Sequence, residues 1–152
     1  MLFRSAWATA CATNGETVVS GGAYGVDAAA HRGALAAGGP TVVCMGTAID
    51  RVYPAAHRAL FTTILERGGV LLSEFPPGAN IGAWGHARRN RLIAALSERL
   101  LLAEAAKGSD SLQTAQWAAR FQRRVLVPVP EVGGVREGLE KCSYDEVLPL
   151  PS

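Results

Sequence analysis

A dense cluster of arginines is the first feature of this sequence that could bind a ligand. Arg88, Arg89 and Arg91 stand within four residues, just after His86, at the expected start of a helix. Cations at a helix N-terminus oppose the helix dipole, so this placement calls for a compensating anion. Arg88 and Arg91 share one face of such a helix, whereas Arg89 points elsewhere. Planar guanidinium groups suit phosphates, which favours a phosphate-bearing ligand over a merely solvated charged face.

Two glycine-containing turns, each between an expected strand and an expected helix, could also hold an anion. Residues 20–27 contain three glycines, and residues 104–111 contain Lys107, one of only two lysines in the chain. Backbone N–H groups in such turns can approach an anion, and the following helix N-terminus favours negative charge. Each turn also has a purely structural interpretation, as a tight bend that needs glycine or as a helix cap formed by Ser109 or Asp110.

The sequence contains no recognisable motif for catalysis or for metal binding. The three cysteines stand far apart with no CxxC pair, which indicates a reducing, cytoplasmic setting and neither a disulfide framework nor a zinc site. His31 is expected to be packed or at the surface and His57 to be exposed, which leaves His86 as the one candidate site histidine. No nucleophile stands with a general base in a known pattern, so we expect a binding protein and not an enzyme.

Short apolar runs that alternate with helical stretches must position these residues. The expected strands are residues 17–20, 41–45, 70–73, 100–104 and 125–127, and the expected helices are residues 3–14, 27–37, 54–67, 87–97 and 109–122. The apolar runs lack period-two alternation, which is typical of parallel strands covered on both faces. The pattern predicts a doubly wound α/β domain with a mostly parallel sheet of about five or more strands and helices on both faces. Ligands bind such folds at the carboxyl ends of the strands.

Length and composition limit the class of protein to which this chain can belong. The chain has 152 residues, of which 49% are hydrophobic and 18% charged, and this suits a domain with a sizeable core. The net charge of +2 alone indicates neither a nucleic acid nor a membrane as partner, and no apolar run has the length of a membrane span. We expect a core over residues 1–130 and a peripheral extension over residues 131–152, where glycine and proline interrupt the pattern.

Five motifs follow one another in the order found in one bacterial family. Residues 20–35 resemble SGxAxGIDxxAHxGAL, residues 46–54 resemble GxxxDxxYP, and residues 73–78 match SEFPPG. Residues 88–97 match RRNRIIAGLS, and residues 104–115 resemble EAxxxSGSLxTA. Over about residues 17–130 the chain is therefore similar to the DNA-processing protein A family (DprA, also called Smf).

This resemblance implies a function for the candidate residues. The family has an extended Rossmann-like domain in the bacterial cytoplasm, binds single-stranded DNA in natural transformation and helps to load the recombinase RecA. It works as a dimer and uses no metal or nucleotide cofactor. The resemblance implies the same for this chain, with single-stranded DNA, RecA and a second copy as partners and no membrane. The DNA pocket would be a basic, glycine-lined surface made of Ser20, Gly21, Gly22, Tyr24, Gly25, His86, Arg88, Arg89, Asn90, Arg91, Lys107, Gly108, Ser109 and Ser111.

The chain departs from the family pattern in four places. Tyr24 stands where the family has arginine, so a phosphate-binding cation is replaced by a ring that could stack on a base. The family's NFP is Gly85-His86-Ala87 here, which leaves His86 as a weaker aromatic platform, and Asp110 brings negative charge into the SGS turn. The family's first strand, with its GSR turn, and its flanking helical and winged-helix domains have no counterpart, which indicates a trimmed core or a divergent paralogue.

Two alternatives to DNA binding are retained. A related superfamily contains phosphoribohydrolases that cleave nucleoside monophosphates, which would make this chain a nucleotide-binding or nucleotide-cleaving enzyme or sensor. Their PGGxGTxxE signature should follow the fourth strand, where this chain has residues 104–109 instead. The other alternative is a vestigial oligomeric scaffold with no ligand.

Overall fold

The computed structural model describes residues 2–104, 109–128 and 143–147. The chain divides into two compact units, an N-terminal unit of residues 1–89 and a C-terminal unit of residues 90–151. Helix α4 (Trp84–Leu96) contains the boundary between them. Among the described residues, each unit has its own three-stranded sheet and its own apolar core.

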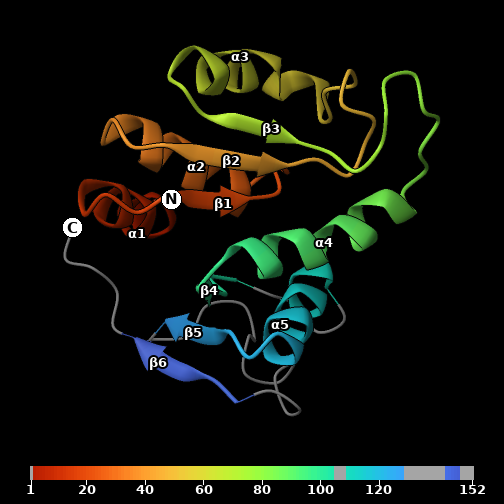
Figure 1. The fold of residues 1–152 in the computed structure, drawn as a ribbon. Coiled ribbons are helices and arrows are strands. Elements are labelled where there is room, and N and C mark those ends of the chain that lie inside the picture. The colour runs from red at the N-terminus through yellow and green to blue at the C-terminus, as the bar shows by residue number, and fades with distance from the viewer. Residues whose placement is uncertain (1, 105–108, 129–142, 148–152) are drawn as a thin grey trace. The chain divides into compact units, whose positions relative to one another are not determined.

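A parallel sheet organises the N-terminal unit (Figure 1). Its strands, in sheet order, are β1 (Val18–Ser20), β2 (Thr41–Cys44) and β3 (Val70–Leu72). Its helices are α1 (Leu2–Thr13), α2 (Val26–Ala36), the 3-10 helix η1 (Ala55–His57) and α3 (Arg58–Glu66). Because all three strands run in the same direction, their carboxyl ends lie at one edge of the sheet.

Local sequence explains where these elements begin and end. Gly38 and Gly68 follow α2 and α3 with positive φ angles of 71° and 79°, a conformation that glycine adopts without steric cost. β-branched residues predominate in β1 and β2, where their side chains pack well on a pleated surface. The buried apolar side chains at the centre of this unit are Val43, Met45, Phe61 and Ile64.

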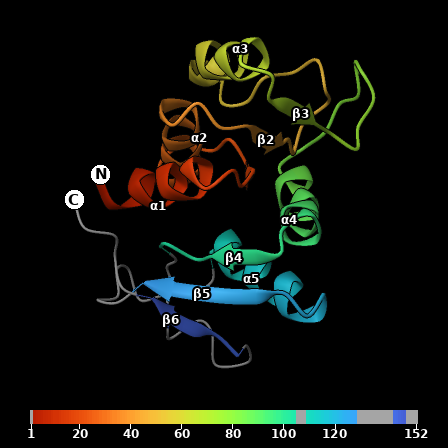
Figure 2. The ribbon, with the colours of Figure 1, turned by 60° about the vertical axis from the view of Figure 1, so that its left-hand side comes forward.

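A second parallel sheet organises the C-terminal unit (Figure 2). Its strands, in sheet order, are β4 (Arg99–Leu101), β5 (Arg124–Pro128) and β6 (Asp145–Val147). Helix α5 (Asp110–Arg120) links the first two strands in the chain. The buried centre of this unit consists of Ala94, Leu102, Leu112, Ala115, Ala118, Val125 and Val127.

The expected α/β class with parallel sheets is confirmed, because strands alternate with helices and every described strand pair is parallel. The expected single sheet of about five or more strands is wrong, because the described strands form two sheets of three strands each. Residues 54–67 form η1 and α3 in place of one helix. Strand β6 was not predicted, because Asp145 and Glu146 give it no apolar run. Most of the extension expected at residues 131–152 lies outside the described residues.

None of the helices in the described part of the chain is both long enough and apolar enough to cross a membrane.

Candidate nucleic-acid interface

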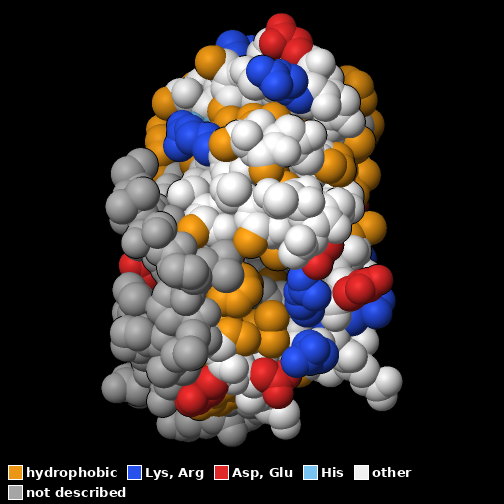
Figure 3. All heavy atoms as spheres, turned by 90° about the vertical axis from the view of Figure 1, so that its left-hand side faces the viewer, with side chains coloured by type: hydrophobic (Ala, Val, Ile, Leu, Met, Phe, Trp, Pro, Cys, Tyr) orange, Lys and Arg blue, Asp and Glu red, His pale blue; other side chains and the backbone are white. Residues whose placement is uncertain are grey.

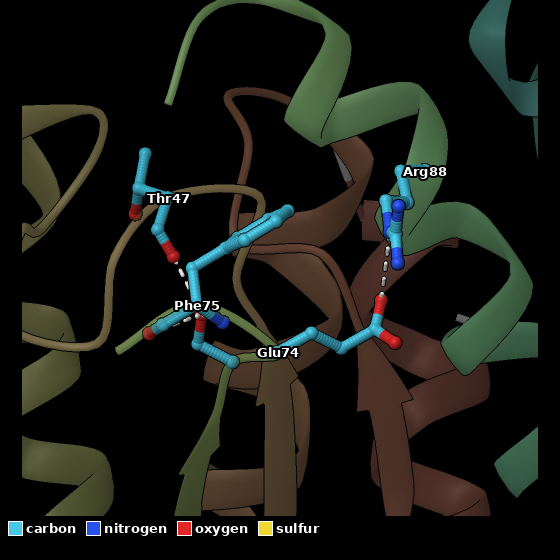
Figure 4. Close-up of polar contacts among 5 residues, drawn as sticks. Thr47, Glu74, Phe75 and Arg88 are labelled. Carbon is cyan, nitrogen blue, oxygen red and sulfur yellow. Dashed lines mark hydrogen bonds and ion pairs between the residues drawn. The ribbon is translucent and has the colours of Figure 1, made fainter. Parts of the chain in front are cut away.

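The loops that follow β1, β2 and β3 leave the sheet at the same edge, and we call them the carboxyl-edge loops (residues 21–25, 45–54 and 73–83). Several hydrogen bonds brace the second loop against the third strand and its loop, and two of them are short. The Met45 N–H donates to Leu72 O (2.7 Å). Ser73 Oγ donates to Thr47 O (2.6 Å; Figure 4). Because ligands of open parallel sheets bind at this edge, these braced loops are the expected position of a binding site.

One carboxylate holds the loop after β1 closed. Ser20 Oγ donates to Asp27 Oδ1 (2.7 Å), and the Ala23 N–H donates to Asp27 Oδ2 (3.0 Å). Gly22 and Gly25 have positive φ angles of 77° and 81°, so the chain can turn twice within four residues. Asp27 lies in the first turn of α2, as expected, but its side chain bonds the preceding loop. It therefore occupies one backbone donor that a phosphate could otherwise use.

His57 lies beneath this loop. Its side chain is only 6% exposed, and its Nδ1 stands 2.8 Å from Gly22 O. Since a carbonyl oxygen only accepts hydrogen bonds, Nδ1 carries the proton in this contact. The exposed position expected for His57 is thus wrong. His57 ends a 3-10 turn that precedes α3, so its side chain does not point in the direction that one continuous helix would give it.

Two arginines at the start of α4 have opposite environments. Arg89 is only 5% exposed, and its Nη1 donates to Cys44 O (2.6 Å). A Cβ atom on Gly21 would overlap Nη1 and stand 2.5 Å from Arg89 Cζ, so the guanidinium lies directly against the glycine backbone. Arg88 is exposed, and its Nε stands 3.8 Å from Glu74 Oε2 (Figure 4). The buried arginine therefore supplies positive charge beneath the glycine loop, and the exposed one is available to a ligand that displaces Glu74.

The start of α4 packs closely on the loop after β2. A Cβ atom on Gly46 would stand 2.5 Å from His86 Nδ1, and one on Gly85 would overlap Gly46 O. The rings of His86 and Tyr53 are 5.2 Å apart, centroid to centroid, and tilted by 47°. Glycine at both positions is what allows the helix to approach the loop and to place His86 beside Tyr53.

The other predicted site residues belong to the C-terminal unit. Asn90 is buried, and its Nδ2 donates to Asp110 O (3.2 Å). Ser109 is the N-cap of α5 without a side-chain capping bond, and its buried Oγ has no hydrogen-bond partner among the described residues. Arg91 and Ser111 are half-buried, and Lys107 and Gly108 lie outside the described residues. The structure thus brings the predicted residues together in two groups, one in each unit.

A buried polar cluster lies below the glycine loop. The pKa of His31 is lowered to about 4, chiefly by burial, with the charge of Asp27 opposing the shift and those of Arg89 and His57 adding to it. The Thr41 hydroxyl donates to Val18 O (2.7 Å), so the contact between His31 Nδ1 and Thr41 Oγ1 (2.7 Å) requires a proton on Nδ1.

Burial also raises the pKa of the neighbouring Cys44 thiol to about 11, so this cysteine stays a thiol at neutral pH.

Two exposed rings were missed by sequence reasoning, one in the loop after β2 and one at the start of α4, directly after the third carboxyl-edge loop. Tyr53 is 59% exposed and Trp84 is 55% exposed. Tyr53 belongs to a motif that carries the family resemblance, which could have drawn attention to it. Trp84 belongs to no motif, and its solvent exposure is the signal that identifies it.

Charge is mixed on the side of the molecule where strands β1, β2 and β3 begin. Figure 3 shows basic and acidic side chains interspersed on that face, in keeping with the net charge of +2. Within residues 2–104, 109–128 and 143–147, no group of three or more His, Cys, Asp or Glu side chains is placed to hold a metal ion. The chemistry that the carboxyl-edge loops and the start of α4 offer is hydrogen bonding, cationic attraction and ring stacking.

The sequence matches known proteins over most of its length. The family model described as "DNA recombination-mediator protein A" matches residues 3–141. The protein Smf of Escherichia coli (strain K12) is 39% identical over 122 residues, which are 80% of this chain and 33% of the relative. The protein Smf of Synechocystis is 42% identical over 113 residues, which are 74% of this chain and 28% of the relative. The chain therefore spans about a third of the length of these curated relatives.

Two solved structures resemble the fold. One, described as "Structural insights into the unique single-stranded DNA binding mode of DNA processing protein A from Helicobacter pylori", has a TM-score of 0.82 and 30% sequence identity, and the match covers 94% of this chain and 66% of that chain. The X-ray structure of DNA processing protein A from Streptococcus pneumoniae has a TM-score of 0.74 and 32% identity, covering 94% of this chain and 53% of that chain.

Proposed function

Since this chain belongs to the DNA recombination-mediator protein A family, we propose that it binds single-stranded DNA at the carboxyl-edge loops of its N-terminal unit. The observation that carries this proposal is the burial of Arg89 against Gly21, which puts a fixed positive charge beneath a glycine loop at a sheet edge. Arg89 bonds Cys44 O from directly beneath Gly21, so it fixes the backbone of the loop over which a phosphate would lie.

The proposed DNA-binding residues fall into two groups, one in each unit. In the N-terminal unit, Arg88 contacts a phosphate directly, whereas Arg89 acts through the loop that it supports. The backbone of the glycine loop and the His86 ring complete this part of the site. The C-terminal unit, taken by itself, offers Arg91 and Ser109, whose buried hydroxyl has no hydrogen-bond partner among the described residues.

The wider role follows from the family and its relatives. We propose that the chain acts as a binding protein and not as an enzyme, in DNA uptake and recombination, with RecA as the partner that receives the strand. A homodimer in the cytoplasm is part of the same proposal. These parts of the proposal rest on family membership. The chain spans only 33% of the Escherichia coli relative and 28% of the Synechocystis relative.

Replacing Arg88 by alanine is expected to weaken binding of single strands equally for all base sequences, because phosphate contacts carry no base information. Loss of one phosphate contact should also reduce the slope of log K against log salt concentration by about 0.7. Fluorescence anisotropy with labelled oligonucleotides at several salt concentrations measures both quantities. Arg67→Ala is the matched control, since Arg67 is an exposed arginine at the end of α3, just before the amino end of β3. Equal effects of the two substitutions would contradict the assignment of Arg88.

Replacing Glu74 by glutamine is expected to tighten binding of single strands at low salt. The carboxylate of Glu74 faces Arg88 at 3.8 Å and competes with a phosphate for its charge. An exposed ion pair of this kind is worth up to about 1 kcal/mol, so the gain in affinity should be about two- to fivefold. The gain should vanish when Arg88 is also replaced by alanine. A gain that persists in the double variant would show that Glu74 repels the strand without acting through Arg88.

A further inference from the structure

Three exposed aromatic rings gather at the edge where the proposed site lies. Tyr24 is 67% exposed, Tyr53 is 59% exposed and Trp84 is 55% exposed. Tyr24 belongs to the loop after β1, Tyr53 to the loop after β2, and Trp84 to the start of α4. Among residues 5–89, whose burial the structure describes, the other large apolar side chains that are exposed are the aliphatic Leu65, near the end of α3, and Val70, at the amino end of β3. Within residues 5–89 the exposed aromatic rings are therefore concentrated at the carboxyl edge.

Each exposed ring rests on a second ring from another segment. The pairs, with their centroid separations, are Tyr24 with His57 at 4.7 Å, Tyr53 with His86 at 5.2 Å, and Trp84 with Phe75 at 5.4 Å. These separations lie in the range of favourable aromatic contacts. The supporting ring limits the rotation of the exposed one, so less conformational entropy is lost when a ligand stacks on it.

The support beneath Tyr24 is itself held in place. His57 is 6% exposed, and its contact with Gly22 O fixes the orientation of the imidazole. The support beside Tyr53 is likewise confined, because His86 packs against Gly46 with no space for a methyl group between them. Two of the three exposed rings thus stand on supports that the fold holds rigidly.

We infer that Tyr24, Tyr53 and Trp84 form a stacking platform for unpaired nucleobases, and that this platform selects single strands over duplexes. The inference rests on the proposed function, since it assigns the bases of the same bound strand to these rings. Every base has a π-face that can stack on an aromatic side chain, so the platform accepts any sequence. In a duplex both faces of each base are already stacked, so a double strand cannot use the rings without unstacking.

Stacking complements the phosphate contacts at this edge. Arg88 already faces Glu74, and Arg89 is buried, so neither offers a fully exposed cation to the backbone of a strand. Attraction between a ring and a base depends little on salt, whereas attraction between arginine and phosphate is screened. The platform therefore retains a strand at salt concentrations that weaken the ionic contacts.

The test compares two oligonucleotides of equal length, one of thymidines and one with abasic sites in place of the bases. Both carry the same phosphates, so the unaltered protein should bind the abasic strand about 5- to 100-fold more weakly. Tyr24→Leu and Tyr53→Leu should each weaken binding of the thymidine strand about 5-fold or more and leave the abasic strand unaffected. Tyr24→Phe should retain binding, because the phenylalanine ring also stacks, and Val70→Ala at the opposite edge is the matched control.

The outcomes separate the two proposals. Equal affinity for the two oligonucleotides would overturn the stacking platform and leave DNA binding in place. Binding of neither oligonucleotide would overturn the proposed function, and the platform with it. Equal affinity of the unaltered protein for single-stranded and double-stranded DNA of the same length would overturn the inferred selectivity, even if the leucine variants bind weakly.

Discussion

Gly21→Ala is expected to lower the free energy of unfolding by about 2–4 kcal/mol and to abolish measurable binding of single-stranded DNA. A methyl group at this position would occupy the place of the Arg89 guanidinium, which is 5% exposed and bonded to Cys44 O. The guanidinium would have to leave its site, with the loss of a charge-assisted hydrogen bond and of close packing. Urea unfolding measures the stability, and fluorescence anisotropy with a labelled oligonucleotide measures the binding.

A double-mutant cycle tests whether Arg89 is the cause of this effect. If the methyl group acts by displacing the guanidinium, Gly21→Ala should cost little stability in a protein that already carries Arg89→Ala. The coupling between the two positions should then amount to most of the cost of Gly21→Ala alone. Additive costs would mean that the glycine is needed for the backbone of the loop and not for the arginine below it.

Acidification from pH 7.5 to pH 4.5 is expected to remove about 2–3 kcal/mol of stability through His31 alone. The pKa of this histidine falls from 6.5 to about 4 on folding, because burial disfavours the charged imidazole. Above pH 6.5 the histidine is neutral in both states, and the contribution to stability is complete. As the pH falls below 6.5, the unfolded chain takes up a proton that the folded chain excludes, so stability declines until about pH 4.

Urea unfolding at a series of pH values measures this loss, and a variant isolates its source. His31→Gln retains an amide that can bond to Thr41 Oγ1 but has no group that titrates in this range. Its stability should be lower than that of the unaltered protein at pH 7.5 and should decline less between pH 7.5 and pH 5. A variant that loses stability with pH as steeply as the unaltered protein would place the titrating group elsewhere.

Much of the architecture could be predicted from the sequence because its signals are local. Glycines such as Gly38 and Gly68 end helices through their own φ angles, whatever the rest of the chain does. Runs such as Thr41–Cys44 are apolar without alternation, which indicates a strand covered on both faces in a parallel sheet. The spacing of five motifs pointed to the family that the comparisons show. The polar strand β6 lacks such a signal, and it is defined only by its pairing with β5.

Position in the sequence alone determined that the glycine loop after β1 would lie at one sheet edge with the loops after β2 and β3, because parallel strands bring their carboxyl ends together. Only the tertiary structure decided what each side chain does there. Arg88 and Arg89 are adjacent in the chain, yet one is exposed and the other is buried under Gly21. His57 turns inward, and Tyr53 meets His86 across 33 positions of the chain. Burial and ring contact depend on which distant segments cover a residue, and no local pattern encodes that.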